Sequence, residues 1–208
     1  MKRIADSTVR RLSLYLSFLE ERERERVATI SSDELAHLGG TTSAQVRKDL
    51  SLFGSFGKRG LGYSVAELSK KLREILGLEK QWNVCIIGAG KIGAALARYR
   101  GFADRGFKIS AVYDNDPAKI GKKWENLTVR DVASLEKDAT SEHFDIAVLA
   151  TPSEGAPEVV KLIVGAGIKA ILSFAETQLN VPQDVSVRAV NMAIELEGLS
   201  FALSNRGR

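Results

Sequence analysis

The 208-residue chain contains a single cysteine, only two histidines and no long apolar run. One cysteine, Cys85, excludes an intramolecular disulfide and is typical of a protein in a reducing compartment. No apolar stretch approaches the roughly 18 residues of a membrane-spanning helix, and the N-terminus lacks the apolar core of a signal peptide. We therefore expect a cytoplasmic protein with no membrane segment and no metal, in which Cys85 is a buried, unreactive thiol.

Excess positive charge is confined to the first part of the chain. Residues 1–80 contain 15 Lys and Arg against 11 Asp and Glu, whereas residues 81–208 contain 15 of each. A local excess of this kind indicates a polyanionic partner that binds within residues 1–80.

A glycine pattern follows a short apolar run in the middle of the chain. Residues 83–87 have the Val and Ile content of a strand, residues 91–98 read as a helix, and Gly-x-Gly-x-x-Gly joins them. In a dinucleotide site such glycines permit a tight turn, close approach of the pyrophosphate, and close contact between helix and strand. An ordinary glycine-rich turn is the alternative. We predict a cofactor site at Gly88, Ala89, Gly90, Lys91, Ile92 and Gly93.

Asp114 follows the next apolar run and lies 21 residues after Gly93. A carboxylate at about this spacing accepts hydrogen bonds from the adenosine ribose in NAD-binding proteins. No Lys or Arg follows it directly, so a 2′-phosphate would meet negative charge. We therefore expect NAD(H) rather than NADP(H).

The basic N-terminal part contains a pattern of short helices. An apolar stripe from Val9 to Leu19 predicts a helix over residues 6–22, and Ser31 and Glu34 form a capping box for a second helix. A glycine pair ends that helix, and a third, capped by Thr41 or Thr42, spans Ser43 to about Phe53. Two short helices joined by a glycine turn are typical of a helix-turn-helix motif.

The third helix has a small and basic outer face, and Asp49 is the one acid in residues 43–63. The segment after it places two cations between glycines, like the tip of a β-hairpin wing. A helical hairpin with ordinary surface charge is the alternative. We predict that DNA contacts Ala44, Arg47, Lys48 and Ser51 on the helix, with Lys58 and Arg59 on the wing.

The second half of the chain alternates strands and helices. A capped helix over residues 64–76 leads into it, and Thr151 and Pro152 follow a buried strand over residues 145–150. We expect Thr151 and Pro152 at the carboxyl edge of the sheet, where ligands bind. The predicted fold class is α/β, with a winged helix (1–80), a Rossmann doubly wound parallel sheet (81–190) and a C-terminal helix (191–208).

The C-terminal helix is apolar on more than one face, whereas a surface helix normally has a polar half. It either packs under its own domain, wedges between the domains or crosses to a second subunit. We favour the last two.

A nicotinamide dehydrogenase needs a group that moves a proton as the hydride moves. His37 lies in the helix-turn-helix and His143 at the amino edge of a strand, and no second domain could hold a substrate. We expect no catalytic residues and a protein that binds its nucleotide without turning it over. A small NAD-dependent reductase is the less favoured alternative.

Several motifs closely resemble the Rex family of redox-sensing transcriptional repressors. They span nearly the whole chain: Gln45–Leu50, Phe53–Gly57, Arg59–Tyr63, Ile87–Gly93, Tyr99–Phe102, Gly167–Ile171 and Leu199–Phe201. The resemblance implies a homodimer that exchanges its last helix, binds an inverted-repeat operator, and lets go when NADH is bound. By that match Arg47 and Lys48 belong to the recognition helix and Arg59 to the wing. We count Gln45 and Gly60 among the predicted DNA contacts as well.

Selection between NADH and NAD⁺ has to occur at the nicotinamide ring, because the rest of the two molecules is identical. An apolar pocket favours the neutral, reduced ring. We expect Tyr99, Phe102 and the partner's tail helix near Met192 to line it. Asn191 departs from the family, since some members have an acid there that meets the tyrosine matching Tyr99.

The main alternative to an NADH sensor is a regulator that senses another nucleotide-like ligand, such as a CoA thioester, although Asp114 would repel the ribose 3′-phosphate of that ligand.

Overall fold

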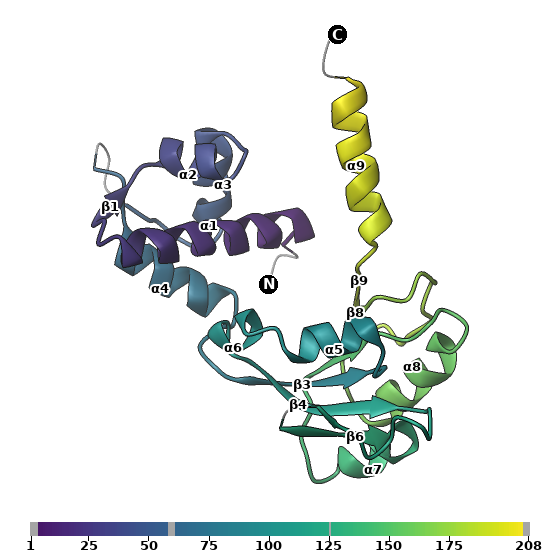
Figure 1. Cartoon of the computed structure of the whole chain (residues 1–208). Coiled ribbons are helices and arrows are strands. Elements are labelled where there is room, and N and C mark those ends of the chain that lie inside the picture. Colours follow the sequence, from purple (N-terminus) through teal and green to yellow (C-terminus); the bar gives the residue numbers. More distant parts are fainter. Residues whose placement is uncertain (1–3, 58–60, 125, 206–208) are drawn as a thin grey trace. The chain divides into compact units, whose positions relative to one another are not determined.

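The computed structural model describes residues 4–57, 61–124 and 126–205, and the chain divides into two compact units, Met1–Lys80 and Gln81–Arg208 (Figure 1). Each unit has its own hydrophobic core. Among the described residues, no helix combines the length and the apolar character needed to cross a membrane.

The described part of the first unit consists of helices around one small sheet. The helices are α1 (Asp6–Arg24), α2 (Ser32–Leu38), α3 (Ser43–Ser51) and α4 (Val65–Ile75), and β1 (Thr29–Ile30) pairs antiparallel with β2 (Tyr63–Ser64). Their inner faces form one core, which includes Leu12, Tyr15, Leu35, Val46, Leu50 and Leu72. The predicted helices are therefore confirmed.

Capping side chains determine where these helices begin. Ser31 accepts a hydrogen bond from the Glu34 N–H, and the Glu34 carboxylate accepts one from the Ser31 N–H at 2.8 Å. The predicted capping box is thus present. Thr42, rather than Thr41, caps α3 by accepting the Gln45 N–H.

Two details of the first unit differ from the prediction. Val9 is exposed, because Thr8 takes the inner position in the first turn of α1. α3 ends at Ser51 instead of Phe53, since the chain turns away before Gly54, whose φ is +136°.

The second unit is an α/β domain whose described residues form a seven-stranded sheet in the order β5-β6-β4-β3-β7-β8-β9. All but one of the strands run parallel, which confirms the doubly wound sheet. β5 pairs antiparallel with β6 and was not expected, because a two-residue strand has no detectable alternation. The strands are β3 (Trp82–Ile87), β4 (Phe107–Asp114), β5 (Lys123–Trp124), β6 (Leu127–Asp131), β7 (Ile146–Leu149), β8 (Ala170–Ser173) and β9 (Ser186–Ala189).

Alternate residues of β3 join different cores, because successive side chains of a strand point to opposite faces. Cys85 and Ile87 pack with α7 (Leu135–Asp138) and α8 (Ala156–Gly165), and Ile86 packs on the other face with α5 (Lys91–Ala97). The unit also contains two short helical pieces, α6 (Gly101–Asp104) and the 3-10 turn η1 (Val132–Ser134). The sheet is therefore covered on both faces, and the carboxyl ends of its parallel strands meet at one edge.

The Cys85 thiol lies fully inside this sheet. Burial raises the pKa of Cys85 to about 12, so the thiolate form is suppressed at neutral pH. The prediction that Cys85 is buried is confirmed, and the raised pKa agrees with an unreactive thiol.

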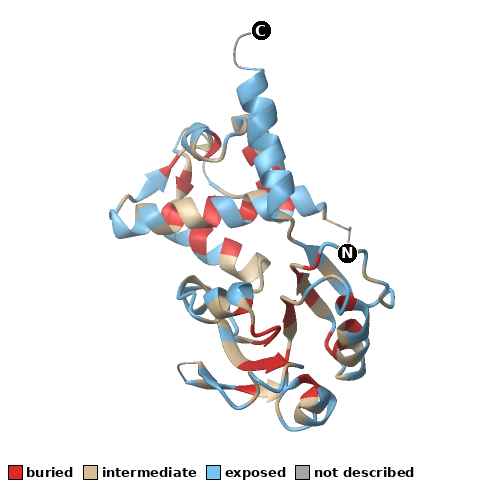
Figure 2. Cartoon of the chain, turned by 45° about the vertical axis from the view of Figure 1, so that its right-hand side comes forward, coloured by how far each residue is buried: buried red, intermediate tan, exposed pale blue. Residues whose placement is uncertain are grey.

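The C-terminal helix, α9 (Met192–Ser204), buries none of its residues in the described chain, and Figure 2 shows it exposed along its whole length. Its large apolar side chains are between 59% and 72% exposed: Met192, Ile194, Leu196, Leu199, Phe201 and Leu203. The alternative in which this helix packs under its own domain is therefore wrong. The two remaining alternatives, a helix that wedges between the domains and one that crosses to a second subunit, would each cover this apolar surface.

Candidate functional site

The turn between β3 and α5 carries the glycine pattern. Gly88 has a φ of +111°, and a Cβ here would collide with the carbonyl oxygen of Ala150. A Cβ at Gly93 would collide with the Gly88 carbonyl oxygen, so α5 approaches β3 only because residue 93 has no side chain. At Gly90, by contrast, no atom lies within 4 Å of the Cβ position. The turn leaves open space at the position expected for the pyrophosphate.

A cavity of about 1230 Å³ lies at the carboxyl edge of the sheet. Pockets for drug-sized molecules have roughly 300–1,000 Å³, so this one has room for a dinucleotide. Its lining brings together seven of the predicted cofactor residues: Gly88, Gly90, Lys91, Ile92, Asp114, Thr151 and Pro152.

Asp114 ends β4 and is 6% exposed. Its Oδ2 accepts the Ala89 N–H at 2.6 Å and the Lys119 Nζ at 3.1 Å, and its Oδ1 accepts the Asp116 N–H at 2.9 Å. Burial acts to raise the pKa of the Asp114 carboxyl, but these donors outweigh it and hold the pKa below its ordinary value. The carboxylate is charged at neutral pH, and one of its four lone-pair positions is left open.

Thr151 follows β7 and offers a hydroxyl to the same cavity. Its Oγ1 is buried and has no hydrogen-bond partner among the described residues. A buried hydroxyl of this kind is rare and calls for a ligand or water to complete it. Three observations therefore agree with a bound nucleotide: the open space at Gly90, the open acceptor position of Asp114 and the unpaired hydroxyl of Thr151.

Four predicted cofactor residues lie elsewhere. Ala89 is buried and its N–H is used by Asp114, while Gly93 serves the contact between α5 and β3. Tyr99 and Phe102 do not line the cavity, and they follow the C-terminal end of α5, a helix about 10 Å long whose first residues do line it. Their rings meet edge to face, 5.0 Å apart, and Tyr99 is 60% exposed. Within one chain, the structure does not bring these two rings to the cofactor cavity.

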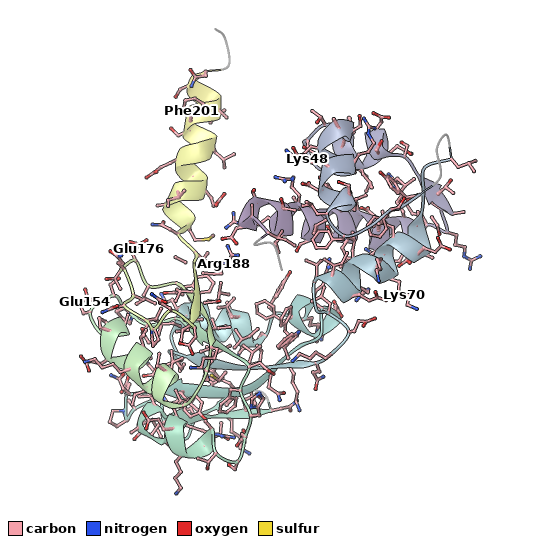
Figure 3. All side chains as sticks on the ribbon, turned by 180° about the vertical axis from the view of Figure 1, so that it is seen from behind. Lys48, Lys70, Glu154, Glu176, Arg188 and Phe201 are labelled. Carbon is pink, nitrogen blue, oxygen red and sulfur yellow. The ribbon has the colours of Figure 1, made fainter. Side chains whose placement is uncertain are left out.

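The cavity also contains charged residues that the sequence did not single out. Lys119 comes five residues after Asp114 rather than directly after it, and a turn brings its ammonium group back to Asp114. Glu154 and Glu176, both labelled in Figure 3, line the side of the cavity next to β7 and β8. The rule that ligands bind beyond the carboxyl ends of strands could have found these two acids.

The second candidate site is the outer face of α3. Ala44, Arg47, Lys48 and Ser51 are all exposed, as predicted; Figure 3 shows the Lys48 side chain. Arg47 Nη1 donates to the Ser32 hydroxyl at 2.8 Å, which ties the guanidinium to the first turn of α2. The predicted wing residues Lys58, Arg59 and Gly60 lie outside the described residues.

Asp49 points away from this face and into the first unit, where it is 1% exposed. Its carboxylate accepts four hydrogen bonds, from Arg11 Nε at 2.6 Å, Arg11 Nη2 at 2.8 Å, Gln45 Nε2 at 2.8 Å and the Tyr15 hydroxyl at 3.1 Å. Burial acts to raise the pKa of Asp49, but these donors hold it below its ordinary value. The negative charge of Asp49 is thus compensated inside the unit, and half-buried Gln45 is engaged there as well.

Among the described residues, no three His, Cys, Asp or Glu side chains are grouped so that they could hold a metal ion. His143, 82% exposed, lies 3.4 Å from Asp145 at the amino end of β7. It lies outside the cavity lining, as expected.

Two family models match parts of the chain. Residues 79–177 match the family described as "CoA binding domain", and residues 3–51 match "Putative DNA-binding protein N-terminus". Apart from residues 79 and 80, the first match lies in the second unit, and the second match lies in the first unit.

Proteins named "Redox-sensing transcriptional repressor Rex" match nearly the whole chain. The one from Carboxydothermus hydrogenoformans is 46% identical over 199 residues, which cover 96% of each chain. A solved structure, "Crystal structure of RSP in complex with beta-NAD+ and operator DNA", has a TM-score of 0.92 and 38% identity over 99% of this chain and 95% of that chain. A structure of RSP with beta-NADH has a TM-score of 0.91 and 36% identity over 99% of this chain and 97% of that chain. Both units are thus matched by proteins named as repressors rather than enzymes, and the chain belongs to the Rex family of redox-sensing transcriptional repressors.

Proposed function

We propose that this chain forms a cytoplasmic homodimer that represses transcription by binding an inverted-repeat operator, and that it releases the operator when NADH is bound. One observation carries the proposal: the same chain has a possible DNA-binding face and a possible dinucleotide site. The outer face of α3 is basic because Arg11 pairs with Asp49, the one acid of residues 43–63, inside the unit. The cavity is large enough for a dinucleotide and contains the charged carboxylate of Asp114 as a ribose acceptor. Structures of the relative RSP with operator DNA and with NADH support it.

On the DNA side, Arg47 and Lys48 reach into the major groove, with Ala44 and Ser51 beside them. A guanidinium has five N–H donors, so the bond from Arg47 to Ser32 leaves donors for a guanine or a phosphate. Gln45 was predicted to contact DNA, but its side chain donates to Asp49, so we propose that it supports α3 from the inner side. Lys58, Arg59 and Gly60 act from the wing.

On the nucleotide side, Asp114 accepts the adenosine ribose hydroxyls, and Gly90 and Lys91 face the pyrophosphate. The nicotinamide half then lies across β3 towards β7 and β8, where Thr151 donates or accepts a hydrogen bond. The oxidation state of this cofactor is the signal, and the chain only binds the cofactor and distinguishes NADH from NAD⁺.

The residues on the nicotinamide side have mixed character. Val159, Leu162 and Phe174 provide apolar surface, whereas Glu154 and Glu176 favour a cationic ring. Preference for the neutral ring therefore depends on further apolar cover. We assign this cover to a second subunit, through its α9, its Tyr99 and its Phe102, because these two rings do not line the cavity of their own chain. Tyr99 and the exposed side chains of α9 supply such a surface.

Deletion of residues 192–208 tests the assembly. We expect a monomer without measurable operator binding, because a twofold dimer presents two α3 helices to two half-sites. A well-folded dimer after the deletion would contradict the role of α9.

The decisive experiment measures operator binding across NADH/NAD⁺ ratios. Operator has to weaken NADH binding by the same factor by which NADH weakens operator binding. NADH is therefore titrated with and without saturating operator, and then NAD⁺ is titrated in the same way. If operator leaves NADH affinity unchanged, or weakens NAD⁺ equally, the sensing mechanism is wrong.

A second candidate is a regulator that senses a CoA thioester, since residues 79–177 match a family described as a CoA binding domain. Asp114 disfavours it, because the charged carboxylate would repel a ribose 3′-phosphate. Titration with acetyl-CoA separates the two candidates: binding tighter than that of NADH would favour the CoA thioester.

A further inference from the structure

We propose that Lys119 competes with the adenosine ribose for Asp114 and lowers the affinity for NADH and NAD⁺ alike; this inference rests on the proposed function. The Lys119 ammonium lies 3.1 Å from Asp114 Oδ2 and 3.8 Å from Asp116 Oδ2, and all three residues line the cavity. A cation is thus bound where the ribose hydroxyls are expected.

The hydrogen-bond capacity of Asp114 creates the competition. A carboxylate has about four lone-pair positions, and three are used, by the N–H groups of Ala89 and Asp116 and by Lys119. A ribose diol needs two positions, and one is open. One of the three donors therefore has to leave when both hydroxyls bind.

Lys119 is the donor that can leave. The Ala89 N–H is held by the turn after β3, and the Asp116 N–H by the turn after β4. The Lys119 ammonium is on a flexible four-carbon stem and its side chain is 38% exposed, so it can exchange Asp114 for water.

The backbone places Lys119 there without help from a ligand. The Lys119 and Ile120 N–H groups both donate to the Asp116 carbonyl oxygen, at 2.9 and 3.1 Å, and the Ala118 N–H donates to Asp116 Oδ1 at 2.9 Å. The turn thereby returns the chain over the end of β4.

Lys119 lowers the affinity for both cofactors by the same factor, because NADH and NAD⁺ share the adenosine half.

The test compares Lys119→Met with wild type by calorimetric titration of NADH, NAD⁺ and NADPH. We expect NADH and NAD⁺ each to bind about fivefold more tightly, with their affinity ratio unchanged. NADPH should bind about threefold more weakly, because its 2′-phosphate loses the cation that lies beside Asp114 and meets the carboxylate alone. A stabilising role for Lys119 in general nucleotide binding would instead move all three affinities in the same direction.

Lys122→Met is the matched control, since it removes a cation three residues away that is exposed and outside the cavity lining. It should leave the three affinities close to those of wild type. The NAD⁺ analogue with 2′-deoxyadenosine needs only one acceptor position, so Lys119→Met should change its affinity less than twofold.

The outcomes separate the two proposals. If wild type binds NADH but Lys119→Met, or Lys119→Gln should the first variant misfold, binds it equally or more weakly, the competition is refuted and the proposed function stands. If wild type binds neither NADH nor NAD⁺, the proposed function fails and this inference fails with it.

Discussion

Each unit of the described chain buries one carboxylate, Asp49 in the first and Asp114 in the second, and the two differ in what donates to them. Asp49 has four donors for four lone pairs, all from side chains of its own unit. Asp114 has three donors, of which Lys119 can move away. Both groups are buried and both have a lowered pKa.

The comparison shows that burial and a shifted pKa do not by themselves identify a binding site. A fully saturated carboxylate holds elements together, as Asp49 does between α1 and α3. A carboxylate with open or exchangeable acceptor positions, next to a cavity, is prepared for a ligand. The following substitutions should separate these two roles.

The largest effect is expected for Asp49→Ala. It leaves Arg11, Tyr15 and Gln45 without their common acceptor, and loss of one partner of a buried pair costs about 3–5 kcal/mol. Both tryptophans, Trp82 and Trp124, lie in the second unit. Denaturation followed by helical circular dichroism should therefore shift, while the tryptophan fluorescence transition should not. Coincident shifts of both signals would show that the two units unfold together.

Asp114→Ala should mainly change cofactor affinity, whereas Asp49→Ala mainly changes stability. Loss of two hydrogen bonds to a charged acceptor should weaken NADH by about 100-fold. NADPH should change much less, because the removed charge also repelled its 2′-phosphate. Calorimetric titration measures both, and the fluorescence transition reports stability. An unchanged affinity for NADH would remove Asp114 from the site.

Substitution of the α3 face should leave both carboxylates untouched and affect operator binding only. Arg47→Ala should cost about 1–3 kcal/mol if it reads a base, and Lys48→Ala should lower the slope of affinity against salt by about one if it contacts a phosphate. Operator titration at several salt concentrations distinguishes these losses. Wild-type binding by both variants would show that α3 is not the recognition helix.

The smallest effect concerns pH. Because Asp49 has a lowered pKa in the folded protein, its contribution to stability is present above its unfolded pKa of about 4 and is lost as the pH falls through the folded value. Asp49→Asn should flatten the acid side of the stability curve of the first unit. A curve with the wild-type slope would mean that other carboxylates dominate acid unfolding.

Much of the fold is determined by local patterns in the sequence. The glycine pattern at Gly88 to Gly93, the capping box of Ser31 and Glu34, and the spacing of Asp114 each depend on backbone geometry within a few residues or on one strand-helix-strand unit. The outer face of α3 follows from the 100° turn per residue of a helix. Such features could be predicted because neighbouring residues alone specify them.

Tertiary structure decided which of these residues meet. Only the folded chain shows that Asp49 faces Arg11 across 38 residues, that Ala89 donates to Asp114, and that Tyr99 does not line the cavity. The competition at Asp114 has the same origin, because Lys119 reaches the carboxylate through a turn that leaves no periodic signal. A sequence pattern records which residues can form a helix, a strand or a turn, but the partners of a buried charge depend on distances through space, which are set when distant segments pack together.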